Sequence, residues 1–272
     1  MSLYQSPITF IMPAYNCAAT VEESVRSIMN GNFNDGDELI IVNDCSTDST
    51  STVLSKIQCD HPRIKVLDHH HNRGGGAARN TAVRNASNDL IFCLDSDNIL
   101  IPGSVRVLKE CMQQKMADVI AFQEIHYFRD DPNEVTHAWD YGQENVTFSD
   151  YISRVKVPGT SGNYLYTKDS WIMAGGYPES SGALDTWGFG LRQVATGSVM
   201  SLCPSSHYMH RAGHESYWVR DSRNNNTSIM ALGLLIPYLD RLEKRTVDYL
   251  FSKRGRYCWF DKIDMHPLLV RS

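Results

Sequence analysis

Ile91-Phe-Cys-Leu-Asp-Ser-Asp-Asn98 is the stretch that decides the fold, because an apolar strand here runs directly into two carboxylates. Side chains at positions i and i+2 of an extended chain point to the same side, so Asp95 and Asp97 are expected to face one ligand. Two hard oxygen donors suit Mg²⁺ or Mn²⁺ that keeps its own waters and binds a diphosphate. The alternative is a surface turn, because Asp, Ser and Asn all favour turns.

Upstream of this stretch, strand and helix patterns alternate. Apolar runs typical of strands cover residues 8–12, 38–43, 64–67 and 89–94, and helical patterns cover 21–29, 46–56 and 75–85. Thr20 and Glu23 are placed as a capping box for the first helix. Near-continuous apolar strands separated by helices predict an α/β fold with one Rossmann-like, mostly parallel sheet, wound right-handed and covered on both faces.

Such sheets bind ligands at the carboxyl ends of their strands, where the strand order reverses. The turn Pro13-Ala14-Tyr15-Asn16 follows the first strand, Asn43 and Asp44 end the second, and Asp95 and Asp97 end the fourth. All three groups are therefore expected at one edge of the sheet. This convergence favours a ligand site over a simple turn at Asp95.

The second half of the chain is less regular. Helices are expected from Ser104, over 168–174 and over 185–196, and strands over 118–122, 162–167 and 198–203. Residues 129–150 are polar and turn-rich, which predicts a mobile loop. We therefore divide the chain into a domain of residues 1–222, with a nucleotide-binding half (1–100) and a smaller, mixed acceptor-binding half (101–222), and a C-terminal helical extension (223–272).

Composition narrows the function. With 272 residues, 42% of them hydrophobic and 21% charged, the chain is ordinary for a soluble globular protein. The net charge of −5 argues against a nucleic-acid partner. Pro13 interrupts the only apolar segment near the start, so no signal peptide is expected. Seven dispersed cysteines without a CxxC pair indicate reduced thiols and a cytoplasmic location.

Six short segments then stand in a characteristic order. They are Ile11-Met-Pro-Ala-Tyr-Asn16, Val42-Asn-Asp-Cys-Ser-Thr-Asp-Ser-Thr50, Asn72-Arg-Gly-Gly-Gly-Ala-Ala-Arg-Asn80, Asp95-Ser-Asp97, Gly175-Gly-Tyr-Pro-Glu179 and Asp185-Thr-Trp-Gly-Phe-Gly-Leu-Arg192. Together they resemble the motifs of the family 2 glycosyltransferases, which have the GT-A fold, and the resemblance covers about residues 6 to 220.

The resemblance implies a metal-dependent, inverting enzyme that moves one sugar from a nucleoside-diphosphate sugar, with UDP the expected nucleotide, to an acceptor hydroxyl in glycan or glycoconjugate synthesis. The Q-x-x-R-W motif of processive synthases is absent from the sequence, which favours transfer of single sugars. Two positions depart from the family pattern. Asn43 replaces its first aspartate, and the usual Glu-Asp pair is reduced to Asp185-Thr186, which leaves one carboxylate for acid–base work.

The same resemblance assigns the donor site. Its predicted residues are Pro13, Ala14, Tyr15, Asn16, Asp44, Arg79, Asp95 and Ser96. Asp44 would accept hydrogen bonds from the edge of the base, although an Asx-turn or a helix cap is the simpler explanation for that side chain. Tyr15 would contact the nucleoside or pack in the ordinary way. Arg79 would reach the base or a phosphate, or remain a solvated surface arginine.

The reaction centre is predicted from the remaining polar residues. Asp97 would coordinate the Mg²⁺ or Mn²⁺ that bridges the phosphates, with Asp95 on the ribose or a metal-bound water. His210 is the candidate third ligand and His214 the reserve, although a lone loop histidine is more often solvated. Asp185 is the predicted general base, and a helix N-cap is its alternative role.

Two alternative functions remain. A nucleotidyltransferase would share the nucleotide and cation sites, and an inactive sugar- or nucleotide-binding module would lack a working base. The expected partners are the nucleotide sugar and a glycan or lipid-linked acceptor, and a homodimer is a further expectation. Basic and aromatic residues mix between 244 and 260. They favour packing on the catalytic domain or at a dimer interface slightly over peripheral contact with the inner face of a membrane.

Overall fold

The computed structural model describes residues 6–154, 156–213, 227–265 and 268–271. Within them one nine-stranded sheet has the order β3-β2-β1-β4-β8-β5-β9-β7, with β6 paired to β5. The strands are β1 (Ile8–Ala14), β2 (Glu38–Asn43), β3 (Ile64–Asp68), β4 (Leu90–Cys93), β5 (Val119–Phe128), β6 (His137–Asp140), β7 (Asn145–Val146), β8 (Tyr164–Thr167) and β9 (Met200–Arg211).

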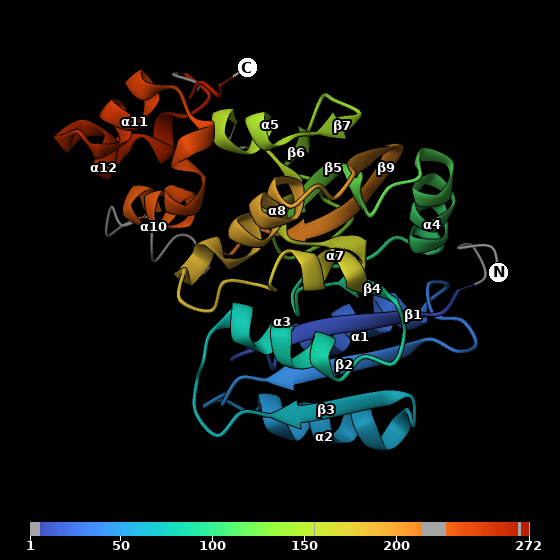
Figure 1. The fold of residues 1–272 in the computed structure, drawn as a ribbon. Coiled ribbons are helices and arrows are strands. Elements are labelled where there is room, and N and C mark those ends of the chain that lie inside the picture. The colour runs from blue at the N-terminus through green and yellow to red at the C-terminus, as the bar shows by residue number, and fades with distance from the viewer. Residues whose placement is uncertain (1–5, 155, 214–226, 266–267, 272) are drawn as a thin grey trace.

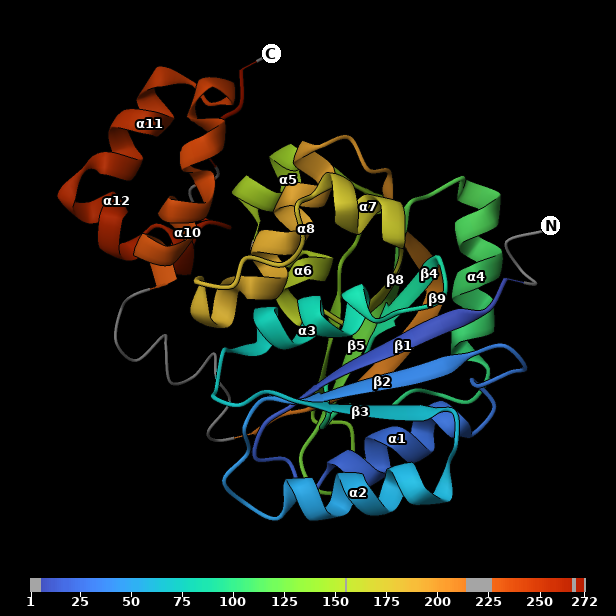
Figure 2. The ribbon, with the colours of Figure 1, turned by 60° about the horizontal axis from the view of Figure 1, so that its bottom comes forward.

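The N-terminal half confirms the predicted α/β pattern. Strands β3, β2, β1 and β4 are parallel. Helices α1 (Val21–Met29) and α2 (Thr50–Asp60) cover one face, and α3 (Gly75–Arg84) covers the other, as Figure 2 shows. Phe10, Ile40 and Phe92 are fully buried between these layers. The strand order reverses between β1 and β4. Open α/β sheets bind their ligands outside the carboxyl ends of the strands at such a reversal, which here means the ends of β1, β2 and β4.

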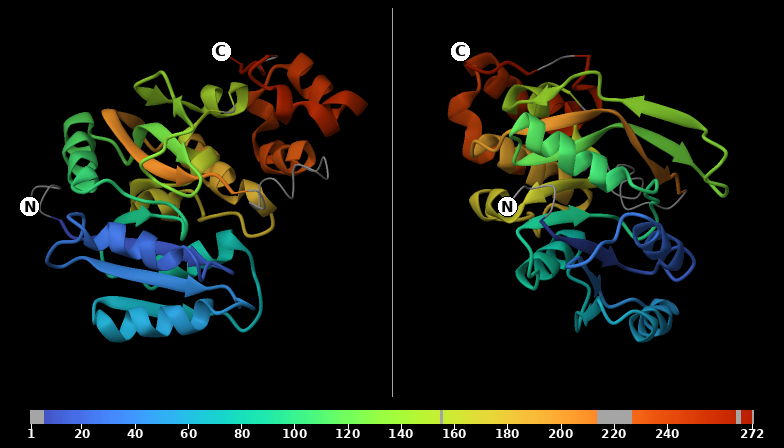
Figure 3. Two further views of the ribbon diagram at one scale, coloured as in Figure 1. Left: turned by 180° about the vertical axis from the view of Figure 1, so that it is seen from behind. Right: turned by 90° about the vertical axis from the view of Figure 1, so that its right-hand side faces the viewer.

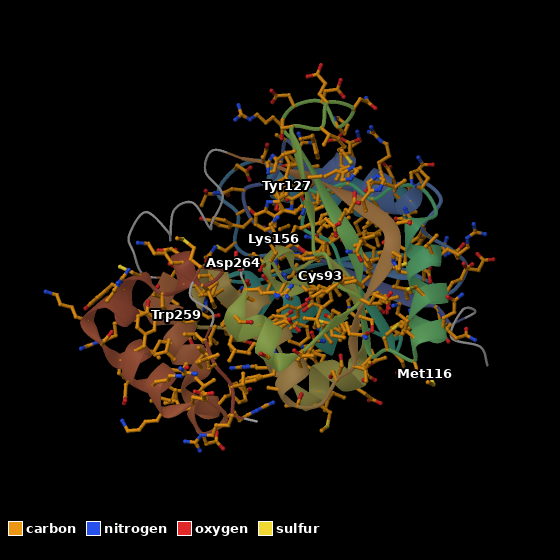
Figure 4. All side chains as sticks on the ribbon, turned by 90° about the horizontal axis from the view of Figure 1, so that it is seen from above. Cys93, Met116, Tyr127, Lys156, Trp259 and Asp264 are labelled. Carbon is orange, nitrogen blue, oxygen red and sulfur yellow. The ribbon has the colours of Figure 1, made fainter. Side chains whose placement is uncertain are left out.

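The C-terminal half continues the same sheet. Strand β8 runs antiparallel between β4 and β5, and β5 pairs in parallel with β9 across a bulge between Phe122 and Glu124. The helices beside these strands are α4 (Ser104–Lys115), α5 (Phe148–Ser153), α6 (Pro158–Ser161), α7 (Lys168–Met173) and α8 (Asp185–Ala195). Cys93 and Cys203 are buried strand residues, as expected, and Cys93 lies near the centre of the view in Figure 4.

Two expectations for this half are wrong. The polar stretch 129–150 is no simple loop, because it contains β6, β7 and the start of α5. Strand β9 extends to Arg211, so His210 lies in a strand and not in the loop after it. Backbone pairing stabilises these segments in spite of their polar side chains, because β6 and β9 pair with β5, and β7 pairs with β9. Figure 3 (right) shows the β5–β6 hairpin extending to one side of the molecule.

Two local predictions near the first helices also fail. Helix α2 begins at Thr50 instead of Ser46, because the side chain of Asn43 accepts a hydrogen bond from the Ser46 N–H at 3.1 Å and holds residues 43–48 in a loop. The capping box does not form at α1. The Thr20 hydroxyl instead donates to the Cys17 carbonyl at 3.4 Å.

The C-terminal helices are α10 (Thr227–Leu235), α11 (Lys244–Phe251) and α12 (Lys253–Cys258). They form a group beside α5 and α8, visible in red and orange in Figure 1. The ring of Phe260 lies edge-on to Trp187 of α8 at 5.2 Å between centroids, and the Arg241 guanidinium lies 3.8 Å from the Phe148 ring centre. Among the described helices, none has the length and hydropathy needed to cross a membrane.

Candidate functional site

The site begins where β1 and β2 end side by side. The Asp44 N–H donates to the Ala14 carbonyl at 2.8 Å. Of the four predicted residues at this turn, Ala14 is buried and Tyr15 is 45% exposed. Asn16 has a positive φ of 49°, and its side-chain oxygen accepts from the Thr47 N–H at 2.8 Å. Tyr15 is therefore the ring that this turn offers to a ligand, while Asn16 ties the two strand ends together.

Asp44 anchors the glycine-containing loop that precedes α3. Its carboxylate accepts from His69 Nδ1 at 2.6 Å, from the Arg73 N–H at 2.9 Å and from the Gly74 N–H at 2.7 Å. The side chain is only 3% exposed. Asp44 thus shapes the loop beside the nucleotide position, and its predicted bond to the base stays a prediction.

Glycines let α3 approach the start of α8 very closely. A Cβ at Gly75 would lie 2.8 Å from Asp185 Oδ2, and one at Gly76 would lie 2.7 Å from the Pro178 carbonyl oxygen. Side chains at these positions would push the two helices apart. The glycine run therefore serves helix packing here, and it brings Arg79 of α3 against Asp185 of α8.

Arg79 is a buried bridge between two carboxylates. One guanidinium nitrogen donates to Asp95 Oδ1 at 2.6 Å and another to Asp185 Oδ2 at 2.7 Å. Burial disfavours the charged guanidinium, but Asp185 and Asp95 outweigh it and hold the pKa of Arg79 well above its usual value. Arg79 is thus no solvated surface arginine, and in this arrangement its two terminal nitrogens bind protein carboxylates.

Asp185 is correspondingly enclosed. Besides Arg79, it accepts from the Thr186 N–H at 2.7 Å, and its side chain is 8% exposed. Burial raises the pKa of Asp185, although the Arg79 charge opposes the shift. The residue is the first of α8 and not its N-cap, which is Leu184. One carboxylate oxygen of Asp185, Oδ2, is therefore already paired with Arg79, and its role as the general base stays a prediction.

The two aspartates that follow β4 lie on a turn beyond the end of the strand, so the turn interpretation is correct, and the ligand site there stays a prediction. The Asn98 N–H donates to the Asp95 carbonyl at 3.2 Å and closes the turn around Ser96. Asn163 fixes Asp95 by accepting from its N–H at 2.8 Å and donating to its Oδ2 at 3.1 Å. Burial, followed by the neighbouring Asp95 charge, raises the pKa of Asp97 to about 7.

The side chains around Asp97 are of the chemical types that bind a divalent cation. A carboxylate whose charge is disfavoured by burial and by a second carboxylate is stabilised by a cation. Burial lowers the pKa of His210 to about 4, so its imidazole is neutral and can act as a ligand at neutral pH. Across the described ranges, no three His, Cys, Asp or Glu side chains form a ready-made metal cluster. His214, the reserve ligand, lies outside them.

Sequence reasoning missed two residues that hold this turn. Asn163 is one, and its amide also donates to the Tyr208 hydroxyl at 3.4 Å. Arg211 is another, because its N–H donates to Asn98 Oδ1 at 3.0 Å and its Nε to the Asp97 carbonyl at 3.3 Å. These residues lie on β9 or just before β8, far along the chain. The sequence has no local pattern that connects them to residues 95–98.

Two of the recognised motifs meet each other. The Asn80 side chain donates to the Tyr177 carbonyl and to Glu179 Oε1, both at 2.9 Å, and accepts from the Tyr177 N–H at 2.9 Å. Asn80 and Glu179 thus join α3 to the turn before α8. Trp187, which follows Thr186 in the α8 motif, is 1% exposed and packs in the core, so its ring has no free face for a sugar.

Comparison with known proteins matches the part of the chain that contains the first four motifs. The Glycosyl transferase family 2 model matches residues 9–169. Chondroitin synthase of Escherichia coli is 27% identical over 182 residues, which cover 65% of this chain and 25% of that protein. Glycosyltransferase GlyG of Streptococcus pneumoniae is 26% identical over 169 residues, which cover 61% of this chain and 54% of that protein. The chain therefore spans about a quarter to a half of these relatives.

Solved structures show the same fold. S. aureus TarS in complex with UDP-GlcNAc superposes with a TM-score of 0.66 at 18% identity, covering 95% of this chain and 70% of that one. Mannosyltransferase PcManGT from Pyrobaculum calidifontis, in complex with GDP-Man and Mn²⁺, gives 0.59 at 17% identity, covering 85% of this chain and 64% of that one. At these identities the likeness concerns the GT-A fold alone.

Proposed function

The chain belongs to glycosyl transferase family 2, and from this premise we propose that it moves a single sugar from a UDP-sugar to a hydroxyl of a glycan or lipid-linked acceptor, with inversion. The observation that carries the proposal is the bridge that Arg79 makes between Asp95, which follows β4, and Asp185, which begins α8, beside the loop that Asp44 holds after β2. Ligands of open α/β sheets bind at the carboxyl ends of the strands.

The donor would lie across the ends of β1 and β4. Tyr15 would stack on the nucleoside beside the loop that Asp44 holds, and the Asp95–Asp97 turn would face the diphosphate. Asp97 and His210 are the residues that would hold Mg²⁺ or Mn²⁺. A bound cation would neutralise charge on the departing diphosphate, which is a typical contribution of metals to such reactions.

Transfer would need one proton acceptor at the sugar. Asp185 would take the acceptor hydroxyl proton while that oxygen forms a bond to the anomeric carbon and the bond to the diphosphate breaks. The leaving diphosphate keeps the electron pair. Because Arg79 occupies Oδ2 of Asp185, the acceptor must either approach Oδ1 or displace the guanidinium.

The same ion pair favours a second candidate, a nucleotide-sugar-binding module without turnover. Thr186 stands where the family has a second carboxylate, and Asp185 is bound to Arg79. Such a module would bind the donor as tightly as an enzyme does but would release no UDP.

A thermal-shift panel tests the donor site. Ligand at about 100 times its dissociation constant stabilises the native state by about 2.7 kcal/mol, which raises the melting temperature. We expect UDP with Mn²⁺ to raise it, and UDP in excess chelator to have a smaller effect. Asp97→Asn should lose the Mn²⁺-dependent part, while the exposed control Asp35→Asn should keep it. A response to UTP alone would point instead to nucleotidyl transfer and overturn the proposal.

Measuring the release of UDP from UDP-GlcNAc, UDP-glucose and UDP-galactose then distinguishes an active transferase from a binding module without turnover. Turnover that increases with added oligosaccharide supports the transferase. Donor binding with no UDP release from any donor, with or without acceptor, supports the module.

A further inference from the structure

A face of aromatic side chains lies beside the reaction centre, on three neighbouring strands. In the register of the sheet, Tyr127 of β5 stands opposite His137 of β6 and His210 of β9, and the next row places Ile125 between Trp139 and Tyr208. Cross-strand partners share one face of a sheet. We name Tyr127, His137, Trp139, Tyr208 and His210 the aromatic face.

The rings contact one another in sequence. Tyr127 is stacked on His137 with centroids 4.3 Å apart, lies edge-on to Trp139 at 5.6 Å and is tilted against His210 at 4.8 Å. Nδ1 of His210 lies 3.3 Å from the Tyr208 hydroxyl. The rings therefore form one connected cluster, in which Tyr208 is buried at 1% exposure and joins the outer rings to the core.

This surface leads directly to the predicted donor site. The Tyr208 hydroxyl accepts from Asn163, and the same Asn163 amide donates to Asp95 Oδ2. His210, at the near end, is the candidate metal ligand. A molecule lying on Tyr127 and Trp139 would consequently approach the sugar end of a bound donor.

The far end of the face is open to solvent. His137 is exposed, and Tyr127 and Trp139 are half-buried. The exposed Lys156 holds its ammonium 5.5 Å from the Trp139 ring centre. Lys156 and Tyr127 are both labelled in Figure 4, where they lie close together in the view. Half-buried rings surrounded by imidazole, phenol and ammonium groups combine an apolar platform with a polar rim.

We propose that the aromatic face is the acceptor subsite and that it takes the pyranose ring of a glycan. The C–H face of the ring lies on Trp139, with the edge-on Tyr127 ring at its side, and its hydroxyls bond to His137 and Lys156. The assignment rests on the proposed function, and it makes Trp139 a residue that determines acceptor binding and has no contact with the donor.

Saturation-transfer NMR with methyl β-D-glucopyranoside and methyl β-D-galactopyranoside at millimolar concentration tests the subsite. Wild-type protein should transfer saturation to at least one glycoside, most strongly to protons on one face of its ring. Trp139→Ala should weaken binding about tenfold, the upper size of one aromatic contact. Trp139→Phe should restore most of it, and the hairpin control Val135→Ala should match wild type.

The thermal response to UDP with Mn²⁺, measured on the same variants, separates this proposal from the proposed function. A normal UDP response with no saturation transfer from wild-type protein, or with equal transfer from Trp139→Ala, overturns the subsite and leaves the donor site intact. Saturation transfer that depends on Trp139 in a protein without a UDP response supports a sugar-binding face and overturns the donor site.

Discussion

Arg79 is the side chain that couples the two halves of the site. Its guanidinium binds Asp95, which follows β4, and Asp185, which begins α8. Removing one partner of a buried ion pair leaves an uncompensated charge, at a cost of about 3–5 kcal/mol. Arg79 retains a second carboxylate if either aspartate is changed, so single carboxylate-to-amide variants are expected to remain folded and can be assayed.

Asp185→Asn tests the predicted base. The amide keeps the size of the side chain and can still accept from the Thr186 N–H, but it cannot take a proton. We expect turnover to fall roughly 10²–10⁴-fold, with the thermal response to UDP unchanged. Steady-state kinetics and the pH profile of turnover measure this. Unchanged turnover would show that Asp185 only positions Arg79.

Asp97→Asn tests the predicted cation ligand. Losing one preorganised electrostatic contact typically lowers turnover on the order of 10²–10³-fold, and added Mn²⁺ should not restore the rate. The melting temperature at pH 7 and above should not fall and is expected to rise, because burial and the Asp95 charge disfavour the ionised Asp97 carboxylate and the amide carries no charge. Asp35→Asn is again the exposed control. If Asp97→Asn kept wild-type activity, Asp97 would not be a metal ligand and the proposed metal dependence would be wrong.

At the scale of elements, helix α3 sets the distance between the halves. Its first residues are glycines because Pro178 and Asp185 lie against them, and its Asn80 binds the turn before α8. The sequence predicts a helix over residues 75–85 but does not explain its glycines. The structure shows that Gly76 lets α3 lie against the Pro178 backbone, whereas a Cβ at Gly75 would meet only the side-chain ends of Arg79 and Asp185.

Gly76→Ala is expected to destabilise the protein. The new Cβ would lie 2.7 Å from the Pro178 carbonyl oxygen, a backbone atom that cannot rotate away. Overpacking of this kind costs about 1–3 kcal/mol, which urea unfolding would measure. Gly233→Ala is the matched control: it is exposed, lies in helix α10 and has nothing within 4 Å of its Cβ position. It should stabilise by about 0.5–1 kcal/mol, and an equal loss from both would contradict the packing argument.

At the scale of the whole molecule, the C-terminal segment buries some of its aromatic side chains and exposes others. Trp259 and Phe260 are buried at 1% and 2% exposure, which agrees with the packing role favoured from the sequence. Phe251 and Tyr257 are 44% and 46% exposed. Lys253, Arg254 and Arg256 are exposed beside them, and within the described residues none of the three forms an ion pair. Peripheral contact with a membrane, the second expectation from the sequence, would use this outer surface.

Co-sedimentation with lipid vesicles tests whether this outer surface contacts a membrane. We expect binding to phosphatidylglycerol-containing vesicles, but not to phosphatidylcholine alone, with weakening at high salt. Each basic residue contributes about 1 kcal/mol, so the triple variant Lys253→Gln, Arg254→Gln, Arg256→Gln should bind on the order of 100-fold more weakly. Lys244→Gln, Arg245→Gln is the control, since those side chains pair with Asp248 and Glu243. Equal binding by wild type and the triple variant would exclude this surface.

The sequence by itself determined which elements follow one another along the first hundred residues, the family, and the place of Asp95 and Asp97 after a buried strand. Local apolar periodicity and motif spacing carry that information. Only the tertiary structure decided that Arg79 bridges Asp95 and Asp185, that Asn163 and Arg211 hold the turn, and that residues 137–140 and 208–211 are strands. Those features depend on contacts between residues far apart in the chain, and nothing in the local sequence encodes which distant partner a polar side chain will meet.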